Sequence, residues 1–478
     1  MSRSRPSITV PIALALALAL ASGAYASQGE PASGSRPLSA RAASGYHQIP
    51  TAFAGFNAPF RKNSWQALSP ELGQAAAGLA PGALRVFGGT TANYWNWRKG
   101  QFYDRHGVPR DLRRANRRMS RIYMSDWAKL VADANATPVF DLNLVTSRLS
   151  SQLAMLRRAR ELGMPIRRVE LGNELYSHGT LIDRAIPTPK AYGRKATRWI
   201  RAIKRRFRHA RVAAVGLGSS LWWPPRTRRG RWDPEVLSTL HGEDAVTFHT
   251  YWKPPPGRLS HARLSKVLAA PLHRFFELRA GGIRPLPDGV FAWVTEWNVW
   301  HGSPLLGKWA NGLSDAEYLL ALLGEPRVRQ EDLHALINRR PFAALFANAE
   351  GFGANKPATV PFAPTAVGRA LGELYPLLSG TARVRRLTVP DSPLIQGTRF
   401  AAIQAVAVRG RGVLLLNVDG HRHRVQLGEG PGCDGSLDSI WARPAARITG
   451  HAGEVRHQAV GVQGPLSLPP YSVNRLDC

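Results

Sequence analysis

Short apolar runs alternate with amphipathic helical stretches along most of the chain, beginning near residue 46. An uninterrupted apolar run is typical of a strand buried on both faces, whereas apolar residues three and four positions apart indicate a helix. The runs predict eight strands, at residues 52–57, 83–87, 137–144, 168–171, 211–217, 245–250, 291–295 and 342–347. The helices expected between them include residues 124–135, 150–162, 194–207, 264–280 and 314–323.

Strands and helices in strict alternation predict a barrel, and the pattern then changes. Eight such units indicate a (β/α)8 barrel over residues 46–377, whose last helix is expected at residues 365–377. Beyond about residue 383 only short strands separated by Gly, Pro and Asp turns remain. The predicted fold class is therefore α/β, a (β/α)8 TIM barrel with a C-terminal antiparallel β-sandwich domain at residues 378–478. Its strands are expected at residues 386–389, 400–408, 412–418, 422–427 and 472–476.

The N-terminus has the pattern of a secretory signal peptide over residues 1–26. Arg3 and Arg5 precede an apolar run, and residues 24–26 have the small-x-small pattern of a cleavage site. The run is too short for a typical bilayer-spanning helix, so no membrane segment is expected after cleavage. Residues 27–45 are rich in Ser, Gly, Pro and Ala and predict a flexible leader. The predicted location is secreted or periplasmic.

Cys433 and Cys478 are the only cysteines of the chain. In an oxidising compartment they are expected to form one disulfide that tethers the C-terminus, and two unpaired thiols are the alternative. No His/Cys cluster has the spacing of zinc ligands, so neither a metal nor an organic cofactor is predicted.

The formal net charge is +32 at pH 7, an excess that attracts anionic polymers and surfaces. The basic stretch at residues 194–211 carries its apolar residues at helical spacing, which places its arginines on the outer face of a packed helix. The arginines of residues 226–231 lie in a Pro/Gly-bounded loop and can reach a ligand. We interpret the charge mainly as solvated arginine faces and predict no nucleic-acid partner.

Two glutamates follow strand-like runs 122 positions apart, Glu174 after the predicted fourth strand and Glu296 after the seventh. The C-terminal ends of barrel strands form one mouth, so both carboxylates are expected to face it. Cleavage of a glycosidic bond requires such a pair, one as proton donor and one as nucleophile or base. A separation of about 5–5.5 Å would give retention of the anomeric configuration, and a wider gap inversion. The alternative for each residue alone is a solvated charge.

Several neighbouring residues are candidates for binding or supporting roles. Asn173 can donate to a sugar hydroxyl, and Tyr251 can hydrogen-bond the nucleophile and tune its ionisation. His249 is expected to line the pocket, with a purely structural role as the alternative. Arg85 on the second strand should be buried and paired with Glu296 or with Glu170, and Glu170 is expected to be structural.

Aromatic residues are frequent in the predicted loops, and Trp300 is the candidate among them for contact with a sugar ring. Sugar rings have apolar faces that stack on aromatic side chains, which suits a carbohydrate cleft. Ordinary packing is the alternative for about half of these aromatic residues.

These motifs resemble the large clan of retaining glycosidases whose acid/base residue follows Asn on strand four and whose nucleophile ends strand seven. The stretches that carry the resemblance over residues 46–478 are 68–90, 170–174, 246–251 and 468–473. Within that clan they look most like the heparanase and β-glucuronidase family. The resemblance implies Glu174 as acid/base and Glu296 as nucleophile.

Two segments depart from the heparanase pattern. Leu175-Tyr176 stands where that family usually has Pro-Asn, and Glu296-Trp297-Asn298 looks more like the α-L-arabinofuranosidases of the same clan. The catalytic pair is unaffected by these departures, and the two segments point to different sugars.

The sequence thus predicts a secreted retaining glycoside hydrolase that acts on a polysaccharide or oligosaccharide, with an acidic, uronic-acid-containing glycan as the first candidate. An arabinofuranosidase-like hydrolase is the alternative within the clan. A non-catalytic protein that binds polyanions or glycans is the alternative from another class, and the intact Glu174, Glu296, Asn173 and Tyr251 argue against it.

Overall fold

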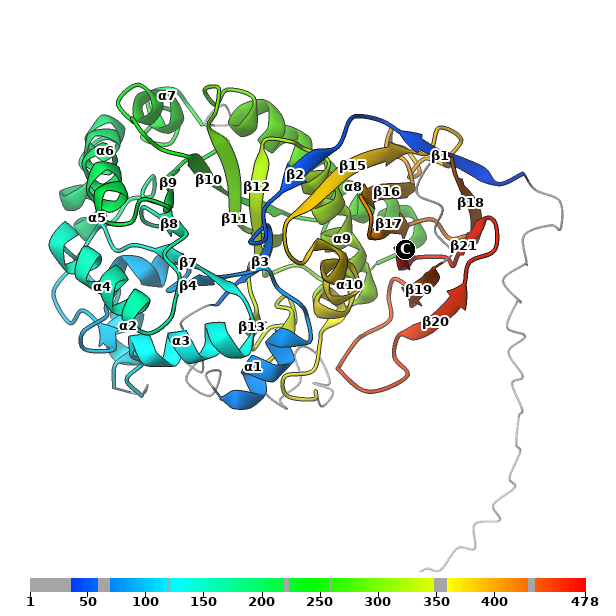
Figure 1. The fold of residues 1–478 in the computed structure, drawn as a ribbon, viewed down its shortest axis with the longest axis horizontal. Coiled ribbons are helices and arrows are strands. Elements are labelled where there is room, and N and C mark those ends of the chain that lie inside the picture. Colours follow the sequence, from blue (N-terminus) through cyan, green and yellow to red (C-terminus); the bar gives the residue numbers. More distant parts are fainter. Residues whose placement is uncertain are drawn as a thin grey trace, which may run out of the picture. The chain divides into compact units, whose positions relative to one another are not determined.

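The computed structural model describes residues 36–58, 69–117, 120–218, 223–257, 259–347, 359–428 and 435–478. Eight parallel strands close into a barrel, and a second, mostly antiparallel sheet is built from strands that precede and follow the barrel in the chain (Figure 1). The predicted fold class is therefore confirmed. The barrel strands are β3 (Ala54–Asn57), β4 (Ala83–Val86), β7 (Thr137–Asp141), β8 (Arg168–Glu170), β9 (Arg211–Val215), β10 (Ala245–Trp252), β11 (Phe291–Val299) and β12 (Val328–Leu333).

The eighth strand lies elsewhere than the sequence pattern predicts. β12 (Val328–Leu333) closes the barrel between β11 and β3, whereas the predicted strand at 342–347 forms only the short β14 (Leu345–Phe346), paired with β13 (Ile337–Asn338). β12 has no apolar run because Gln330, Glu331 and Asp332 are buried polar residues. They have polar partners inside the fold, such as Arg168, whose Nη1 donates to Gln330 Oε1 at 2.7 Å. Polar groups can be buried when they are hydrogen-bonded. A search of the sequence for apolar runs therefore does not detect this strand.

Ten helices surround or cap the barrel in the described part of the chain. Pro189 and the side chain of Thr188, which accepts from the backbone N–H of Ala191, start the sixth helix, and Trp199 and Ile203 are on its buried face. No helix within the described ranges is both long and apolar enough to span a bilayer. The helices are α1 (Pro70–Ala77), α2 (Arg110–Ala115), α3 (Met124–Asp133), α4 (Leu149–Glu161), α5 (Thr180–Ala185), α6 (Pro189–Arg206), α7 (Trp232–Leu237), α8 (His261–Leu278), α9 (Trp309–Leu323) and α10 (Ala366–Leu374).

The second sheet forms the β-sandwich, with the strand order β20-β19-β22-β17-β16-β15-β1-β18-β21 and β2 paired with β15. All its pairs are antiparallel except β1 with β18. A separate apolar core, which includes Leu387, Leu415 and Leu476, fills it. Its strands are β1 (Leu38–Ala42), β2 (His47–Ile49), β15 (Ala382–Thr388), β16 (Ile403–Val408), β17 (Gly412–Asn417), β18 (His423–Leu427), β19 (Ser436–Trp441), β20 (Arg456–Gly461), β21 (Leu466–Leu468) and β22 (Ser472–Asp477).

The predicted flexible leader at residues 27–45 is wrong for residues 38–42. These residues form β1, which pairs with β15 and β18, and Ala40 is buried in the sandwich core. Composition alone suggested a flexible leader. In the structure, Leu38 and Ala40 pack against apolar side chains, and the backbone of residues 38–42 is hydrogen-bonded to a strand on each side. Residues 47–49, assigned to the barrel from sequence, likewise pair with the sandwich strand β15. The predicted signal peptide, residues 27–35 and Cys433 lie outside the described residues, so cleavage and the disulfide stay predictions.

The sandwich packs on the barrel through α9, which is buried along nearly its whole length. Gln404 Nε2 of β16 donates to Glu317 Oε1 of α9 at 2.8 Å, and Trp309 Nε1 donates to the carbonyl of Tyr471 at 2.7 Å. A helix covered on both sides needs no polar face, which explains the apolar sequence of α9.

A single large side chain closes the floor of the barrel. Trp293 on β11 is buried among small residues from other strands, including Ala83, Ala213 and Ala245. The guanidinium of Arg168 lies 4.9 Å from the Trp293 ring centroid and covers it on the side of β8. The small neighbours leave the volume that the indole occupies, so the interior is packed rather than hollow at this level.

Replacement of Trp293 by Ala should therefore lower the free energy of unfolding by about 3–5 kcal/mol, because it removes buried apolar surface and leaves a cavity among the small side chains packed against the indole. Chemical denaturation of purified protein measures the effect. Trp223→Ala is the matched control, since Trp223 is 38% exposed and its loss should cost far less. Equal destabilisation by the two changes would contradict this account of the barrel floor.

Candidate active site

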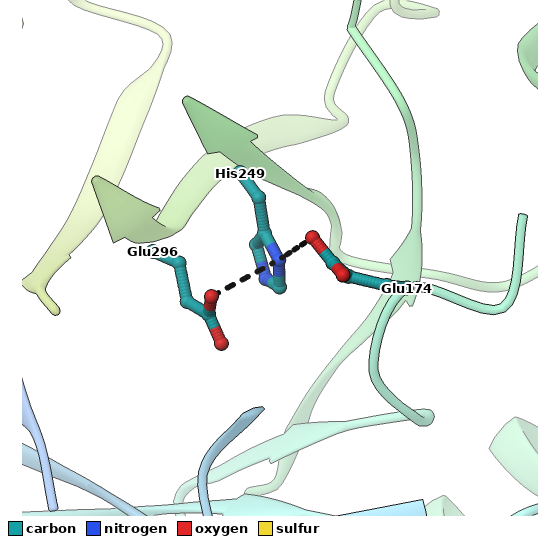
Figure 2. Close-up of side chains that lie close together, drawn as sticks. All are labelled: Glu174, His249 and Glu296. Carbon is teal, nitrogen blue, oxygen red and sulfur yellow. Dashed lines mark hydrogen bonds and ion pairs between the residues drawn. The ribbon is translucent and has the colours of Figure 1, made fainter. Parts of the chain in front are cut away.

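The two predicted glutamates face each other in a cavity of about 410 Å³ at the C-terminal ends of the barrel strands (Figure 2). One carboxylate oxygen of Glu174, one of Glu296 and one ring nitrogen of His249 lie within 4.8 Å of one another. The cavity is lined by Glu174, Tyr176, Leu217, Trp223, Arg229, His249, Tyr251, Arg274, Glu296, Val299, Trp300, His301, His334 and Phe342.

Glu174 is presented by a tight turn that follows β8. The turn needs two residues with positive φ, Gly172 at +90° and Glu174 itself at +46°. A Cβ at Gly172 would come within 2.7 Å of Leu175 Cδ1, so glycine is required there on both conformational and steric grounds. The strained backbone turns the Glu174 side chain into the cavity, where it is 32% exposed. Tyr176 Oη donates to its Oε1 at 2.8 Å.

Glu296 is aimed into the barrel by a β-bulge in β11. Between Trp293 and Glu296 the strand advances three residues while β10 advances two, from Thr247 to His249. The extra residue breaks the alternation, so Thr295 and Glu296 both face the interior. Thr295 Oγ1 reaches Glu170 Oε1 at 3.2 Å, and Glu296 reaches the residues of the mouth. A regular strand would have turned one of these two side chains outward.

The surroundings of Glu296 favour its ionised form. Arg85 Nη1 donates to its Oε1 at 2.9 Å, and Tyr251 Oη donates to its Oε2 at 2.8 Å. Burial alone would raise the pKa of Glu296, but electrostatic interactions, with His249 most strongly and then with His334 and Arg85, and the hydrogen bond from Tyr251 lower that pKa to about 2. Burial and the adjacent Glu296 raise the pKa of Tyr251, so its hydroxyl keeps the proton that it donates.

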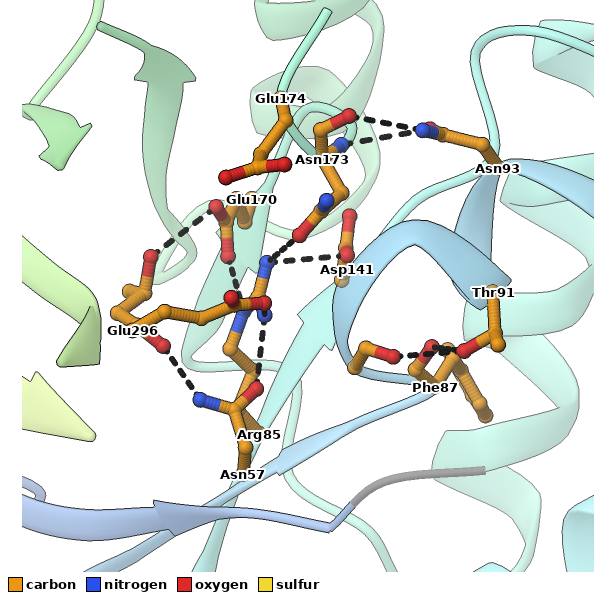
Figure 3. A network of polar contacts seen from close by, with 12 residues as sticks. Asn57, Arg85, Phe87, Thr91, Asn93, Asp141, Glu170, Asn173, Glu174 and Glu296 are labelled. Carbon is orange, nitrogen blue, oxygen red and sulfur yellow. Dashed lines mark hydrogen bonds and ion pairs between the residues drawn. The ribbon is translucent and has the colours of Figure 1, made fainter. Parts of the chain in front are cut away.

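Arg85 on β4 connects most of the site from below (Figure 3). Besides Glu296, its guanidinium donates to Glu170 at 2.6 Å, Asp141 at 3.1 Å and the amide oxygens of Asn57 at 2.7 Å and Asn173 at 2.9 Å. Arg85 is fully buried, and both partners named from sequence, Glu296 and Glu170, are present. Burial and the neighbouring carboxylates raise the pKa of Asp141 well above its usual value although Arg85 opposes this, which limits the negative charge of the cluster.

Asn173 is oriented by this network. Because a guanidinium only donates, the amide oxygen of Asn173 must face Arg85, and the NH2 group must face the other way. Asn93 holds the Asn173 backbone, since its Nδ2 donates to the Asn173 carbonyl at 2.8 Å. This orientation is the one that a donor to a sugar hydroxyl requires.

His249 on β10 lies between the two glutamates, as Figure 2 shows. Its Nδ1 is 3.2 Å from Glu174 Oε1 and 3.6 Å from Glu296 Oε2, and its Nε2 is 3.3 Å from Thr295 Oγ1. Burial lowers the pKa of His249, but the charges of Glu296 and Glu174 outweigh it, so the pKa is raised overall. A protonated imidazole at this point reduces the repulsion between two carboxylates that face each other.

Trp300 lies at the rim of the cavity, where it is 38% exposed and packs edge-on against Tyr251 at 5.9 Å between ring centroids. The ammonium of Lys253 lies 4.9 Å from the Trp300 centroid. All seven residues singled out from sequence therefore lie at the cavity or in the network directly beneath it.

Several residues of the site were not predicted from the sequence. Tyr176 is the hydrogen-bond partner of Glu174, and it stands at the position noted only as a departure from the heparanase pattern. His334 lines the cavity from a loop, and Asp141 supports Arg85 from β7. Arg229, one of the loop arginines of residues 226–231 that were expected to be able to reach a ligand, also lines the cavity. The carboxyl end of β7 was a detectable signal for Asp141, whereas no pattern in the sequence distinguished His334.

The trio Glu174, His249 and Glu296 has the donor types that could share a cation. The structure gives another explanation for its closeness, because Arg85, Tyr251 and Tyr176 already supply the donors that these carboxylates need. The trio is therefore accounted for by hydrogen bonds and ion pairs within the protein.

No protein-family model matches the chain, and no curated protein is detectably similar to it in sequence. Solved structures are similar. An α-L-arabinofuranosidase from Thermotoga maritima has a TM-score of 0.64 at 15% identity, over 91% of this chain and 100% of that one. A family 51 α-L-arabinofuranosidase from Bifidobacterium longum has 0.68 at 17%, over 92% and 97%. A 4-O-α-L-rhamnosyl-β-D-glucuronidase from Fusarium oxysporum 12S has 0.59 at 12%, over 92% and 100%.

These similarities extend over both domains and confirm the fold, a TIM barrel followed by a β-sandwich, which this chain shares with glycoside hydrolases. At 12–17% identity they show the fold alone, so membership of the clan named from the motifs stays a prediction. The closer likeness to heparanase is not supported by them and stays a prediction.

Proposed function

We propose that the protein is a retaining glycoside hydrolase. The observation that carries this proposal is the approach of Glu174 and Glu296, whose nearest carboxylate oxygens lie within 4.8 Å of each other. Retaining enzymes have carboxyl groups about 5–5.5 Å apart, whereas inverting enzymes need about 6.5–9.5 Å to admit a water molecule between them. The gap here matches direct attack by one carboxylate on the sugar.

The environments of the two glutamates suggest how the roles are divided. The side chain of Glu296 is only 7% exposed and is held ionised by Arg85 and Tyr251, as a nucleophile must be. Glu174 is more exposed and lies on the opposite wall beside Tyr176 and His249, where a leaving group and water can reach it.

The reaction then proceeds in two balanced steps. In the first, a carboxylate oxygen of Glu296 bonds to the anomeric carbon, the glycosidic bond breaks, and the proton of Glu174 passes to the leaving oxygen. In the second, Glu174 takes a proton from water, the resulting oxygen bonds to the anomeric carbon, and Glu296 is released. Asn173 donates to a hydroxyl beside the reacting carbon, and Trp300 offers a face for the next sugar ring.

Two sugars are candidates for the cleaved residue. α-L-Arabinofuranosides are the better supported, because similar structures include arabinofuranosidases and the sequence after Glu296 looks like theirs. A uronide is the second candidate, favoured by Arg229. This cavity residue stacks on Trp223 and Tyr176 and has no carboxylate partner among the described residues. Secretion by the predicted signal peptide would place either substrate outside the cytoplasm.

A panel of chromogenic aryl glycosides that includes α-L-arabinofuranoside and β-glucuronide tests the function. We expect turnover of at least one member, with the first-formed sugar product in the same anomeric configuration as the substrate by proton NMR. Absence of turnover on the panel and on natural polymers would contradict the enzyme assignment. A first product of inverted configuration would contradict the retaining mechanism.

The two roles can be separated by the leaving group. Glu296→Gln should lower kcat by about 10³-fold or more on every substrate, because the nucleophile is lost. Glu174→Gln should lower kcat/KM by about 10²–10⁴-fold on substrates with poor leaving groups and far less on dinitrophenyl glycosides, which need no proton. Glu161→Gln, at an exposed glutamate on α4, is the matched control. The same leaving-group dependence in both variants would contradict the assignment of roles.

Removal of the Tyr251 hydroxyl should change the pH profile in a defined direction. Its hydrogen bond lowers the pKa of Glu296, so Tyr251→Phe raises that pKa. Since Glu296 acts in its ionised form, the acidic limb of the kcat/KM profile should move to higher pH, while Tyr123→Phe at an exposed position should leave it in place. An acidic limb that stays or moves to lower pH would contradict this role of Tyr251.

A further inference from the structure

One face of α6 carries a straight row of cations that the proposed mechanism does not use. The row, called here the basic row, consists of Lys190, Arg194, Arg198, Arg201 and Arg205, all exposed. At 100° per residue these five positions fall within an arc of about 80°, and at 1.5 Å per residue they extend over about 22 Å. The opposite face of the helix, with Trp199 and Ile203, is buried against the barrel, so the row faces outward.

The positive charge of the row is not balanced locally. The chain contains no Asp or Glu from residue 184 to residue 232. Among the described residues, no member of the basic row has a carboxylate partner. Nearby acids are engaged by other bases: Asp244 by Lys204 and Arg211, each at 2.8 Å, and Glu235 by Arg231 at 3.1 Å.

The basic row is connected to the cavity by the loop that contains Arg228 and Arg229. Arg228 is buried, and it donates from Nη2 to the carbonyl of Leu175 at 2.7 Å and from Nη1 to that of Pro187 at 3.3 Å. Leu175 follows the catalytic Glu174, and Pro187 precedes the first turn of α6. This arginine therefore fixes the loop between the site and the start of the row.

Arg229, next in the chain, extends the positive charge into the cavity. Its guanidinium lies 4.4 Å from the ring centroid of Trp223 and 5.6 Å from that of Tyr176, and it lines the cavity beside Glu174. Arg229 thus places positive charge on the cavity wall, and its neighbour Arg228 is bonded to the segment that leads into α6.

We propose that the basic row binds one part of a linear acidic polysaccharide while another part of the same polysaccharide molecule occupies the cavity. Only the occupation of the cavity by the polysaccharide rests on the proposed function. Arginine pairs well with carboxylate and sulfate groups through two parallel hydrogen bonds, and a single-file row fits one extended chain. The row gives affinity for the polymer without taking part in cleavage.

The shape and chemistry of the row favour a polysaccharide over other polyanions. The aromatic residues of α6, Tyr192 and Trp199, are buried, so the row offers no ring on which nucleic-acid bases could stack. The apolar face of the helix is equally buried, so the row lacks the apolar side chains that insert into a bilayer.

Binding of the full-length protein to a polygalacturonate chain tests the proposal. The variant Arg194→Gln/Arg198→Gln/Arg201→Gln/Arg205→Gln should bind the polymer about tenfold or more weakly at low salt, with a shallower dependence of log Kd on log salt concentration, since fewer counterions are released. The matched control, Arg284→Gln/Arg383→Gln/Arg424→Gln/Arg456→Gln, removes the same charge from exposed arginines elsewhere and should change Kd by less than about threefold. Circular dichroism and thermal unfolding establish that both variants are folded.

Two outcomes would overturn the proposal. Equal weakening by the two quadruple variants would show that net charge alone attracts the polymer. Loss by the row variant of binding to double-stranded DNA or anionic vesicles, with polygalacturonate binding retained, would assign the row to another polyanion. The binding measurement does not depend on turnover. If no glycoside reacts, the proposed function is contradicted, but the binding test of the basic row can still be read.

Discussion

The architecture of the site depends on one buried guanidinium. Arg85 comes from β4, and its partners come from four other strands or their ends: Asn57 from β3, Asp141 from β7, Glu170 from β8 and Glu296 from β11. An unpaired charge at this depth would cost several kcal/mol, so barrel closure and the placement of Glu296, the proposed nucleophile, stabilise each other. The register of the barrel is in this way coupled to the chemistry at its mouth.

Two local irregularities of the backbone give Glu174 and Glu296 different environments. A turn with positive φ presents Glu174 toward solvent, and a bulge in β11 turns Glu296 toward Arg85. Regular strands would have given both carboxylates similar surroundings and hence similar ionisation. The departures from regular geometry therefore create the difference in environment that the proposed roles of acid and nucleophile require.

The sequence predicted the barrel and the sandwich, and the seven candidate residues named from it lie together at one cavity, because apolar runs and the carboxyl ends of strands carry those signals. It placed the eighth strand wrongly because Gln330, Glu331 and Asp332 are buried polar residues, each with a hydrogen-bond partner inside the fold, and a search for apolar runs cannot detect such a strand. It missed Tyr176 because a side chain two residues from Glu174 reaches it only through the positive-φ turn. It missed β1 because pairing with strands more than 300 residues away leaves no local pattern.

The position of β1 has a consequence for how the molecule forms. Arg41 pairs with Thr388 and Leu38 with Val425, so a strand made early in synthesis finds its partners only after the whole barrel has been made. Such non-local pairing is slow, and until it occurs the edges of β15 and β18 are open to pairing with other chains. The N-terminal strand β1 and the C-terminal strands β15 and β18 complete the sheet only together. Loss of β1, or of β15 and β18, would leave a molecule with a formed barrel and an incomplete, aggregation-prone sheet.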